Sequence, residues 1–326
     1  MEFCVRSIFD EETANSETGH FFDFATEESR LQKARRAVNP ALPQTIEDFH
    51  AAIQDSQYFH INGQSFYRGM VESEGSHKAC IFIFENVLIH FREAHQIFFD
   101  GTFKTTPRLF YQNFVVFFKY LGHVLPGAFI LMSSKSQDLY LAVFQKLRNL
   151  GIAPVQIMSD WELASRNSAS VVWPTATING CFFHYTSAVQ KKLRKLGLAG
   201  EFEVPRSRKT IQQILCLPLL PSEKILTTFN IIKETRTSVA LDSWLNYVER
   251  HWMRGRRVEE LSVFQVKDRT NNYSESVFST FERKLTPHPS VYVFLDFLKK
   301  RTTRDAKILN DCREVSQSDD QDFARL

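Results

Sequence analysis

The chain has 326 residues, enough for one large domain with an insertion or for two smaller domains. Hydrophobic residues make up 43% and charged residues 24%, as in an ordinary globular protein, and the 30 phenylalanines predict a large aromatic core. A net charge of only +3 excludes a dominant basic field, so any nucleic-acid binding has to come from local patches.

Residues 1–44 are polar and charged, and we expect them to form a leader that is partly disordered or helical. Thr45 begins a pattern that resembles a capped helix start, with acidic residues in the first turn. Residues 45–95 mix helical and β-type runs, which predicts a small α+β region.

Residues 96–196 show the most regular pattern of the chain. Three strand-like runs follow one another as in an antiparallel meander, over 97–103, 113–120 and 127–132. They precede a helix, a strand, a helix and a strand, over 137–150, 154–159, 162–172 and 177–183. This succession predicts an α/β fold with a mixed sheet covered by helices on both faces.

The rest of the chain reads as helical. Residues 197–268 show several helical patterns and no strand alternation, which predicts an all-helical insertion. Residues 269–300 are expected to hold a last core helix, starting near Asn272, and a following helix. Residues 301–326 form a highly charged tail that we expect to fray.

The cysteine and hydropathy patterns indicate in which cellular compartment the protein is expected. The five cysteines are scattered and odd in number, which argues against a disulfide framework and favours a reducing, intracellular compartment. Lys119 and His123 interrupt the best candidate for a membrane span, and the acidic first residues lack an apolar signal core. We therefore expect no membrane partner.

Three carboxylates stand in comparable settings on separate predicted elements. Asp100 closes an apolar run next to Gly101, which lets the backbone turn or pack closely. Asp160 follows a second apolar run, and Glu275 lies in the last core helix. Carboxylates without a matching set of histidines favour a hard cation such as Mg²⁺ or Mn²⁺ over zinc.

Four motifs, taken in this order, resemble the transposases of Mutator-like elements (MULE), whose ribonuclease H-like core carries a DDE triad. They are DGTFKTTPRLFYQ at 100–112, SDWELA at 159–164, GCFFH at 180–184 and RTNNYSES at 269–276. The resemblance covers roughly residues 40–285. It implies a ribonuclease H-like mixed sheet flanked by helices, with the helical insertion placed before the last catalytic helix.

The same resemblance implies a chemistry. Asp100, Asp160 and Glu275 would be catalytic and would bind two Mg²⁺ or Mn²⁺ ions, which activate the attacking oxygen and stabilise the leaving one. The reaction would be strand cleavage at an element end followed by strand transfer into target DNA. Double-stranded DNA would be the partner, the nucleus the location, and a homo-oligomer a further candidate assembly.

Supporting residues follow from the motifs. Cys181 and His184 match the C-x-x-H signature of the family, and Asn271 and Asn272 belong to its TNN motif. A structural zinc would need two more ligands, so we favour packing and hydrogen bonding beneath the site for the Cys–His pair.

Basic side chains near these motifs are candidates for phosphate contacts. They are Lys104, Lys191, Lys192, Arg194 and Lys195. Solvated helix faces are an equal alternative. If the side chains line one groove, DNA binding weakens steeply with salt.

Each carboxylate has a structural alternative. Asp100 could be a turn acid after a strand, and Asp160 could cap the helix that follows it. Glu162 and Glu282 compete with Glu275 as the third acid.

The whole chain has an alternative as well: a catalytically inactive or domesticated relative that binds DNA or protein, because a fold does not guarantee a function. No Cys/His grouping before residue 95 has zinc-finger spacing, which favours this second hypothesis.

Overall fold

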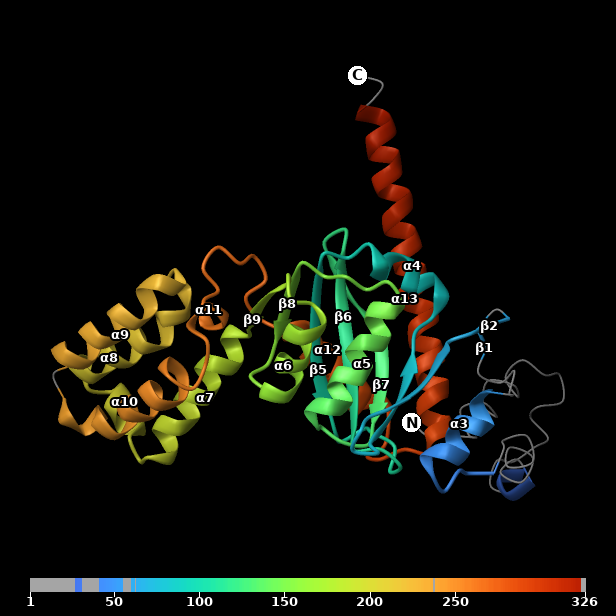
Figure 1. The fold of residues 1–326 in the computed structure, drawn as a ribbon, viewed down its shortest axis with the longest axis horizontal. Coiled ribbons are helices and arrows are strands. Elements are labelled where there is room, and N and C mark those ends of the chain that lie inside the picture. The colour runs from blue at the N-terminus through green and yellow to red at the C-terminus, as the bar shows by residue number, and fades with distance from the viewer. Residues whose placement is uncertain (1–26, 31–40, 55–59, 62, 237, 324–326) are drawn as a thin grey trace. The chain divides into compact units, whose positions relative to one another are not determined.

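The computed structural model describes residues 27–30, 41–54, 60–61, 63–236 and 238–323, with side chains to Glu314 (Figure 1). Most of the leader expected over residues 1–44 lies outside this part, and residues 27–30 are helical. None of the described helices is long and apolar enough to cross a membrane.

Seven strands of the described chain form one mixed sheet in the order β3-β4-β7-β6-β5-β8-β9. Their bounds are β3 Tyr67–Glu72, β4 Lys78–Phe82, β5 Gln96–Thr102, β6 Gln112–Tyr120, β7 His123–Met132, β8 Gln156–Ser159 and β9 Thr177–Gly180. A separate two-stranded sheet consists of β1 (His60–Ile61) and β2 (Gln64–Ser65). The mixed α/β sheet expected from the sequence is therefore confirmed.

Strand directions divide the sheet into two parts. Pairing is antiparallel between β3 and β4, between β4 and β7, and between β6 and β7. It is parallel between β5 and β8 and between β8 and β9.

The strand predicted over 177–183 is too long, because β9 ends at Gly180 and a helix starts at Phe182. The apolar run at 181–183 fits the start of a helix as well as a strand, and Phe183 is 42% exposed.

Contacts divide the chain into two compact units. The first contains residues 1–94, 101–152 and 273–326, and the second contains residues 95–100 and 153–272. Because each unit combines separate segments of the chain, the domain boundaries expected from the sequence remain a prediction.

Helices α3 (Ile46–Gln54), α4 (Glu85–Arg92), α5 (Gln137–Asn149), α12 (Asn272–Lys284) and α13 (Val291–Phe323) accompany the first unit. Phe114 of β6 contacts Tyr140 of α5, with ring centroids 5.1 Å apart. Phe129 of β7 is paired with Val115 and stacks on Phe281 of α12 at 6.0 Å. Successive residues of a strand point to opposite faces, so α5 and α12 cover opposite faces of the sheet. Phenylalanine rings fill both layers, as the composition suggested.

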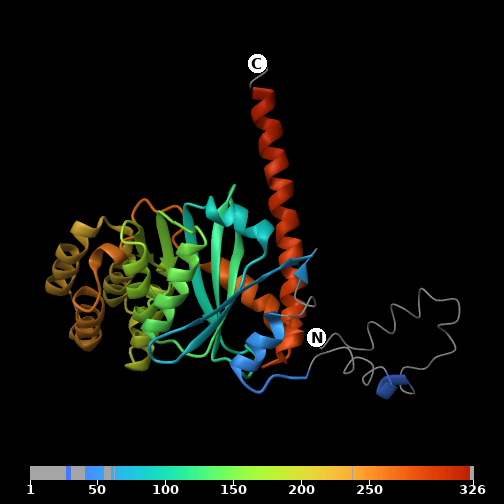
Figure 2. The ribbon, with the colours of Figure 1, turned by 45° about the vertical axis from the view of Figure 1, so that its right-hand side comes forward.

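Helix α13 continues through the segment that we expected to fray. Figures 1 and 2 show it as one unbroken red helix, and it packs on α4 and β7. Thr302, Asp305 and Leu309 recur at helical spacing and are buried. Arg301 Nε donates to Asp305 Oδ2 at 2.8 Å, so the buried carboxylate is paired. The expectation of fraying from residue 301 is therefore wrong, at least to Leu309.

The second unit has its own core. It contains β8, β9, α6 (Leu163–Val172), α7 (Phe182–Lys195), α8 (Pro205–Cys216), α9 (Ser222–Thr235), α10 (Asp242–Val248), a π-helix (Glu249–Met253) and α11 (Val258–Leu261). Tyr185 Oη donates to Ile214 O at 2.8 Å, and Trp244 Nε1 donates to Val189 O at 3.0 Å. These bonds satisfy the polar atoms of buried aromatic side chains. Between residues 197 and 268 the described chain contains helices and loops, as the sequence predicted.

The packing of α13 predicts the effect of a cavity near its middle. Leu309 is 1% exposed. Replacing it with alanine should lower the free energy of unfolding by about 2–5 kcal/mol, because the lost contacts leave a cavity. The control Lys307→Ala changes an exposed residue of the same helix and should stay within about 0.5 kcal/mol. Urea unfolding measures both, and equal values would show that this part of α13 is not packed.

His90 on α4 predicts a pH dependence of stability. It is 2% exposed, and its ring lies 4.7 Å from that of Tyr120. Burial is the main cause that lowers the pKa of His90; Glu93 and Asn310 oppose this effect and Arg313 adds to it.

Because the folded-state pKa lies below the unfolded value of about 6.5, stability from His90 is present above that pH and is lost as the pH falls toward the folded pKa. Urea midpoints should therefore fall more between about pH 7.5 and about pH 5.5 in the parent than in His90→Phe. An equal decline in both proteins would contradict the assignment to His90.

Candidate active site

Asp100 and Asp160 come to neighbouring positions of two parallel strands. The register of β5 and β8 pairs Phe99 with Ser159. The next residue after each of these two is an aspartate. Neighbouring strands lie about 4.8 Å apart, and paired residues of parallel strands point to the same face. Both aspartates are half-buried. The backbone thus brings the two aspartates to neighbouring positions at the carboxyl end of β8.

Local sequence explains this placement. Ile97 and Phe98 of β5, and Ile157 and Met158 of β8, are completely buried. Continuous apolar runs of this kind are typical of parallel strands covered on both faces. The acidic residues follow at the points where these apolar runs end.

Gly101 lies inside β5, which continues to Thr102. A Cβ atom at this position would come within 2.7 Å of Gln112 Oε1, so a larger residue here would displace the end of the Gln112 side chain. Of the two roles considered for Gly101, close packing agrees with this contact. Asp100 consequently lies in a strand, and the alternative of a turn acid is wrong.

The Asp160 side chain also supports the local turn. Its Oδ1 atom accepts the Glu162 backbone N–H at 3.2 Å. Helix α6 begins one residue later, at Leu163, and no side chain caps its first turn. Asp160 therefore does not cap α6 itself, and its side chain bonds only to Glu162, the residue before the helix.

Trp161 fixes the loop that follows Asp160. A Cβ atom at Gly180 would come within 2.0 Å of the Trp161 ring, so this glycine makes room for the indole. The indole Nε1 donates to Cys181 O at 3.1 Å, and the ring meets Trp252 edge-to-face at 4.9 Å. The loop is therefore held against both β9 and the helical insertion.

Arg166 of α6 also holds the loop that follows β8. It is 1% exposed, and its Nη1 donates to Ser159 Oγ at 2.9 Å and to Asp160 O at 3.3 Å. Its Nε and Nη2 donate to Glu260 Oε2 at 3.0 and 2.5 Å. Burial lowers the pKa of Arg166 and Glu260 opposes this effect, so the guanidinium stays charged at neutral pH. A buried ion pair thus joins the Asp160 backbone to α11.

The C-x-x-H pair and the TNN motif lie beside the first aspartate strand. Cys181 is completely buried, and its Sγ accepts the Asn271 backbone N–H at 3.3 Å. The Asn271 side chain donates through Nδ2 to Phe99 O at 3.3 Å, one residue before Asp100. These contacts fit the expected role of Cys181 in packing and hydrogen bonding.

His184 responds to the charges around it. Cys181 is the largest cause that raises its pKa; Asp100 and Asp160 raise it further, and burial opposes them, with a result of about 9. The His184 Nδ1 atom is buried and has no hydrogen-bond partner within the described chain. His184 is therefore a cation near both aspartates at neutral pH.

Glu275 and its competitors lie on other elements. Glu275 is exposed in the first turn of α12 and belongs to the first unit, whereas both aspartates belong to the second. Asn272 is the exposed first residue of α12. Glu282 forms an ion pair with Lys104 at 2.8 Å, so each neutralises the other.

Within the described part of the chain, no group of three or more His, Cys, Asp or Glu side chains is arranged to hold a metal ion. The oxygen donors of Asp100 and Asp160 are of the type that Mg²⁺ and Mn²⁺ prefer. The donor chemistry therefore fits these cations, and metal binding itself stays a prediction.

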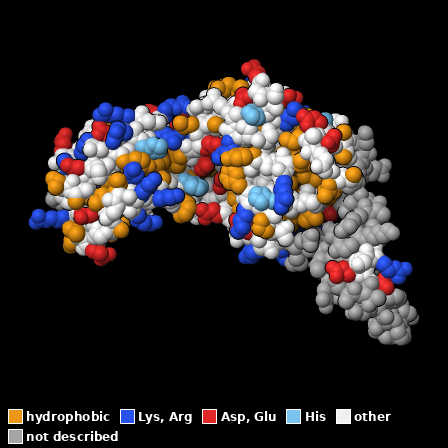
Figure 3. Space-filling view, turned by 90° about the horizontal axis from the view of Figure 1, so that it is seen from below, with side chains coloured by type: hydrophobic (Ala, Val, Ile, Leu, Met, Phe, Trp, Pro, Cys, Tyr) orange, Lys and Arg blue, Asp and Glu red, His pale blue; other side chains and the backbone are white. Residues whose placement is uncertain are grey.

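The basic candidates on α7 lie on its surface. Lys191, Arg194 and Lys195 are exposed, and Lys192 Nζ lies 5.3 Å from the Tyr247 ring centroid. Figure 3 shows Lys and Arg side chains interspersed with Asp and Glu side chains on one face. This arrangement agrees with the low net charge, and the DNA contacts stay a prediction.

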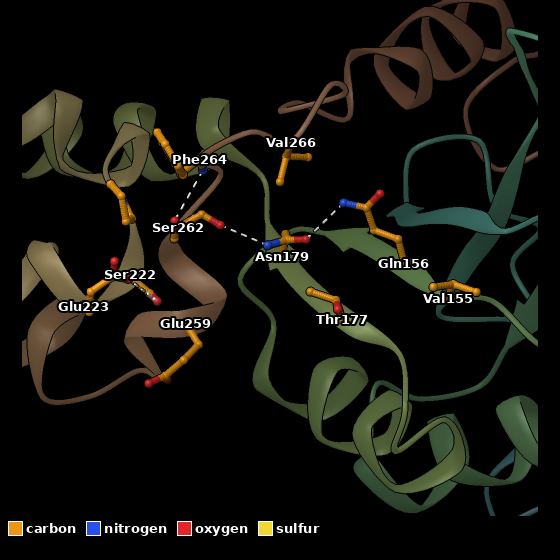
Figure 4. A pocket seen from close by; sticks show the side chains of 11 residues that line it. Val155, Gln156, Thr177, Asn179, Ser222, Glu223, Glu259, Ser262, Phe264 and Val266 are labelled. Atoms are coloured by element: carbon orange, nitrogen blue, oxygen red, sulfur yellow. Dashed lines mark hydrogen bonds between the residues drawn. The ribbon is translucent and has the colours of Figure 1, made fainter.

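A cavity of about 560 Å³ lies at the other end of β8 and β9 (Figure 4). Gln156 Nε2 donates to Asn179 Oδ1 at 3.3 Å, and Asn179 Nδ2 donates to Ser262 O at 2.9 Å. Val155 and Thr177 line it near the amino ends of the strands, whereas Asp160 follows the carboxyl end of β8. This cavity is therefore separate from the aspartate pair.

Comparison with known families identifies the segment that carries this geometry. Residues 96–188 match the family model described as the MULE transposase domain. This segment, less than a third of the chain, is similar to the MULE transposase domain. It contains Asp100, Asp160, Cys181 and His184, and the predicted family is confirmed. No curated protein matches the chain.

Sequence reasoning missed Trp161 and Arg166. The tryptophan stands inside the SDWELA motif, but its partner Gly180 is 19 positions away and its role depends on the fold. Arg166 gave a usable signal, because it falls on the helix face that also carries the small residues Ser165 and Ala169.

The Arg166–Glu260 pair predicts an asymmetric response to mutation. Arg166→Met leaves Glu260 without its buried partner and should lower the free energy of unfolding by about 3–5 kcal/mol. The double variant Arg166→Met/Glu260→Met should recover part of this loss. The control Arg257→Met removes an exposed partner of Glu260, at 2.6 Å, and should cost about 0–1 kcal/mol. Urea unfolding decides, and equal losses at positions 166 and 257 would refute the buried role.

Proposed function

We propose that the MULE transposase domain of this chain cleaves DNA strands and transfers them to target DNA through the triad Asp100, Asp160 and Glu275, with divalent metal ions. The observation that carries this proposal is the register that pairs Phe99 with Ser159 and so brings two aspartates to adjacent positions. The match of residues 96–188 to the family includes both aspartates.

The strand arrangement supports a ribonuclease H-like core. Strands β7, β6 and β5 are neighbours in that order, and β8 and β9 follow β5 with parallel pairing. This succession fits three strands of a meander followed by two strands that alternate with helices. In such α/β sheets, active sites form at the carboxyl ends of the parallel strands, where both aspartates stand.

Chain connectivity supports Glu275 as the third acid. The Asn271 side chain is bonded to the backbone of Phe99, and α12 begins at the next residue. A helix rises 1.5 Å per residue, so Glu275 lies only about 6 Å beyond Asn271 along the axis of the helix. Glu282 lies two further turns along and is paired with Lys104.

The side chains of the domain have different roles in the proposed strand cleavage. Asp100 and Asp160 provide oxygen ligands, and Arg166 and Trp161 hold the backbone next to Asp160. When bound, two Mg²⁺ or Mn²⁺ ions supply electrophilic stabilisation of the attacking and leaving oxygens of the phosphate. Protonated His184 offsets part of the negative charge of the carboxylates.

The proposed substrates are double-stranded element ends and target DNA, which also implies a nuclear location. Exposed Lys191, Arg194 and Lys195 are the proposed phosphate contacts on α7. A homo-oligomer would allow two element ends to be held together.

A nicking assay tests the catalytic claim. Purified protein with Mn²⁺ should nick supercoiled plasmid, and Asp100→Asn and Asp160→Asn should each lower the rate roughly 10²- to 10³-fold, because a metal ligand is lost. The control Asp311→Asn changes an exposed acid of α13 and should keep the parent rate. Chelation with EDTA should abolish nicking in every protein.

Equal nicking by the parent and both aspartate variants would refute the proposed enzyme. A parent that binds DNA but never nicks it would instead leave the catalytically inactive, DNA- or protein-binding relative as the function of the chain.

A further inference from the structure

Two aromatic side chains stand exposed at the ends of the loop between β5 and β6. Phe103 is 42% exposed and Tyr111 is 56% exposed. Their ring centroids are 5.5 Å apart with an interplanar angle of 74°, and Lys135 Nζ lies 5.2 Å from the Phe103 centroid. We call Phe103 and Tyr111 the ring pair. An exposed ring pair with an adjacent cation combines the two features that bind unpaired nucleic-acid bases.

The loop that carries the ring pair is rigidly held. Thr106 is completely buried, and its Oγ1 donates to Thr102 O at 2.8 Å and accepts the Asn113 N–H at 2.9 Å. The Thr106 carbonyl lies 3.0 Å from His288 Nδ1. A loop fixed in this way presents the rings without a large loss of entropy on binding.

The chain itself keeps the ring pair close to Asp100. Phe103 follows Asp100 by three residues, and an extended chain spans at most about 3.6 Å per residue, or about 11 Å in total. Phosphates along one DNA strand are spaced by about 3.4 Å along the duplex axis. The Cα atoms of Asp100 and Phe103 are therefore separated by no more than about three nucleotide spacings of one strand.

Charges around the ring pair favour an anionic ligand. Lys135 lies over the Phe103 ring, and Arg108 is exposed on the same loop. Lys104, also on the loop, is offset by its ion pair with Glu282. A DNA strand supplies both required groups, because its bases stack on aromatic rings and its phosphates bind cations.

We infer that Phe103 and Tyr111 form a stacking platform for an unpaired base of the DNA substrate, a few nucleotides from the bond cut at Asp100; this inference rests on the proposed function. The substrate class is then DNA that is locally unpaired near the cleavage site. A continuous duplex offers no free base face to the rings.

Binding measured without divalent metal tests the platform. The probe is a short fluorescein-labelled oligothymidylate in EDTA, with a blunt duplex of equal length beside it, and anisotropy gives the Kd. Phe103→Ala and Tyr111→Ala should each weaken oligothymidylate binding roughly five- to hundredfold, and duplex binding should change less than about twofold. The control Phe264→Ala removes a ring that is 45% exposed in the second unit and should leave Kd unchanged.

Further variants separate stacking from general apolar contact. Phe103→Trp should retain oligothymidylate binding, whereas Phe103→Leu should not, because only a ring stacks on a base. Lys135→Gln should reduce the salt dependence of binding, and the ring variants should leave it unchanged. Thermal melting of each variant confirms that these exposed changes leave the fold intact.

Several outcomes would overturn the platform. They are unchanged affinity in the alanine variants, equal losses on both DNA forms, or full rescue by leucine. The first, together with a lowered melting temperature, would assign the rings to contacts within the protein or with another protein.

The nicking assay keeps this inference distinct from the proposed function. A parent that nicks DNA while the ring variants bind normally would defeat only the platform. Lost oligothymidylate binding in the ring variants of a parent that does not nick would defeat only the catalytic function.

Discussion

The parallel pairing of β5 with β8 is the constraint on which the candidate site depends. A slip of one residue would turn Asp160 to the opposite face of the sheet from Asp100. Because β8 is buried on both faces, its apolar pattern alone does not select the register. Contacts at its ends do: the His95 carbonyl accepts N–H groups from Val155 and Gln156 at 2.8 and 2.9 Å, and Arg166 holds Ser159 and Asp160.

The same register creates an electrostatic problem that neighbouring cations reduce. Two carboxylates at adjacent strand positions repel each other, and the low dielectric of a half-buried site strengthens this repulsion. His184 stays protonated near both, with a pKa raised to about 9, and the buried guanidinium of Arg166 reaches the Asp160 backbone. His184 thus opposes the repulsion, whereas the charge of Arg166 is already paired with Glu260. A divalent ion at the proposed site would relieve the repulsion further.

The sequence predicted what depends on local pattern and missed what depends on distant contacts. The strands over β5, β6 and β8 were predictable because each is a short apolar run with a polar end. The tail after residue 301 was misjudged because Asp305, a charged residue, faces the core and is paired with Arg301. The fit of Trp161 against Gly180 joins a loop to a strand and left no trace in local spacing. The position of Glu275 depends on the start of α12, which sequence spacing alone does not fix in space.

The helical insertion belongs to the architecture of the aspartate pair. Strand β9 is an edge of the sheet, and an open edge invites pairing with other chains. Helix α11 packs on β9, and Asn179 is bonded to Ser262, so the insertion covers this edge. From the same helix, Glu260 holds Arg166, which binds the backbone at Asp160. A change in the insertion therefore reaches Asp160 through one buried ion pair, without touching any of the proposed metal ligands.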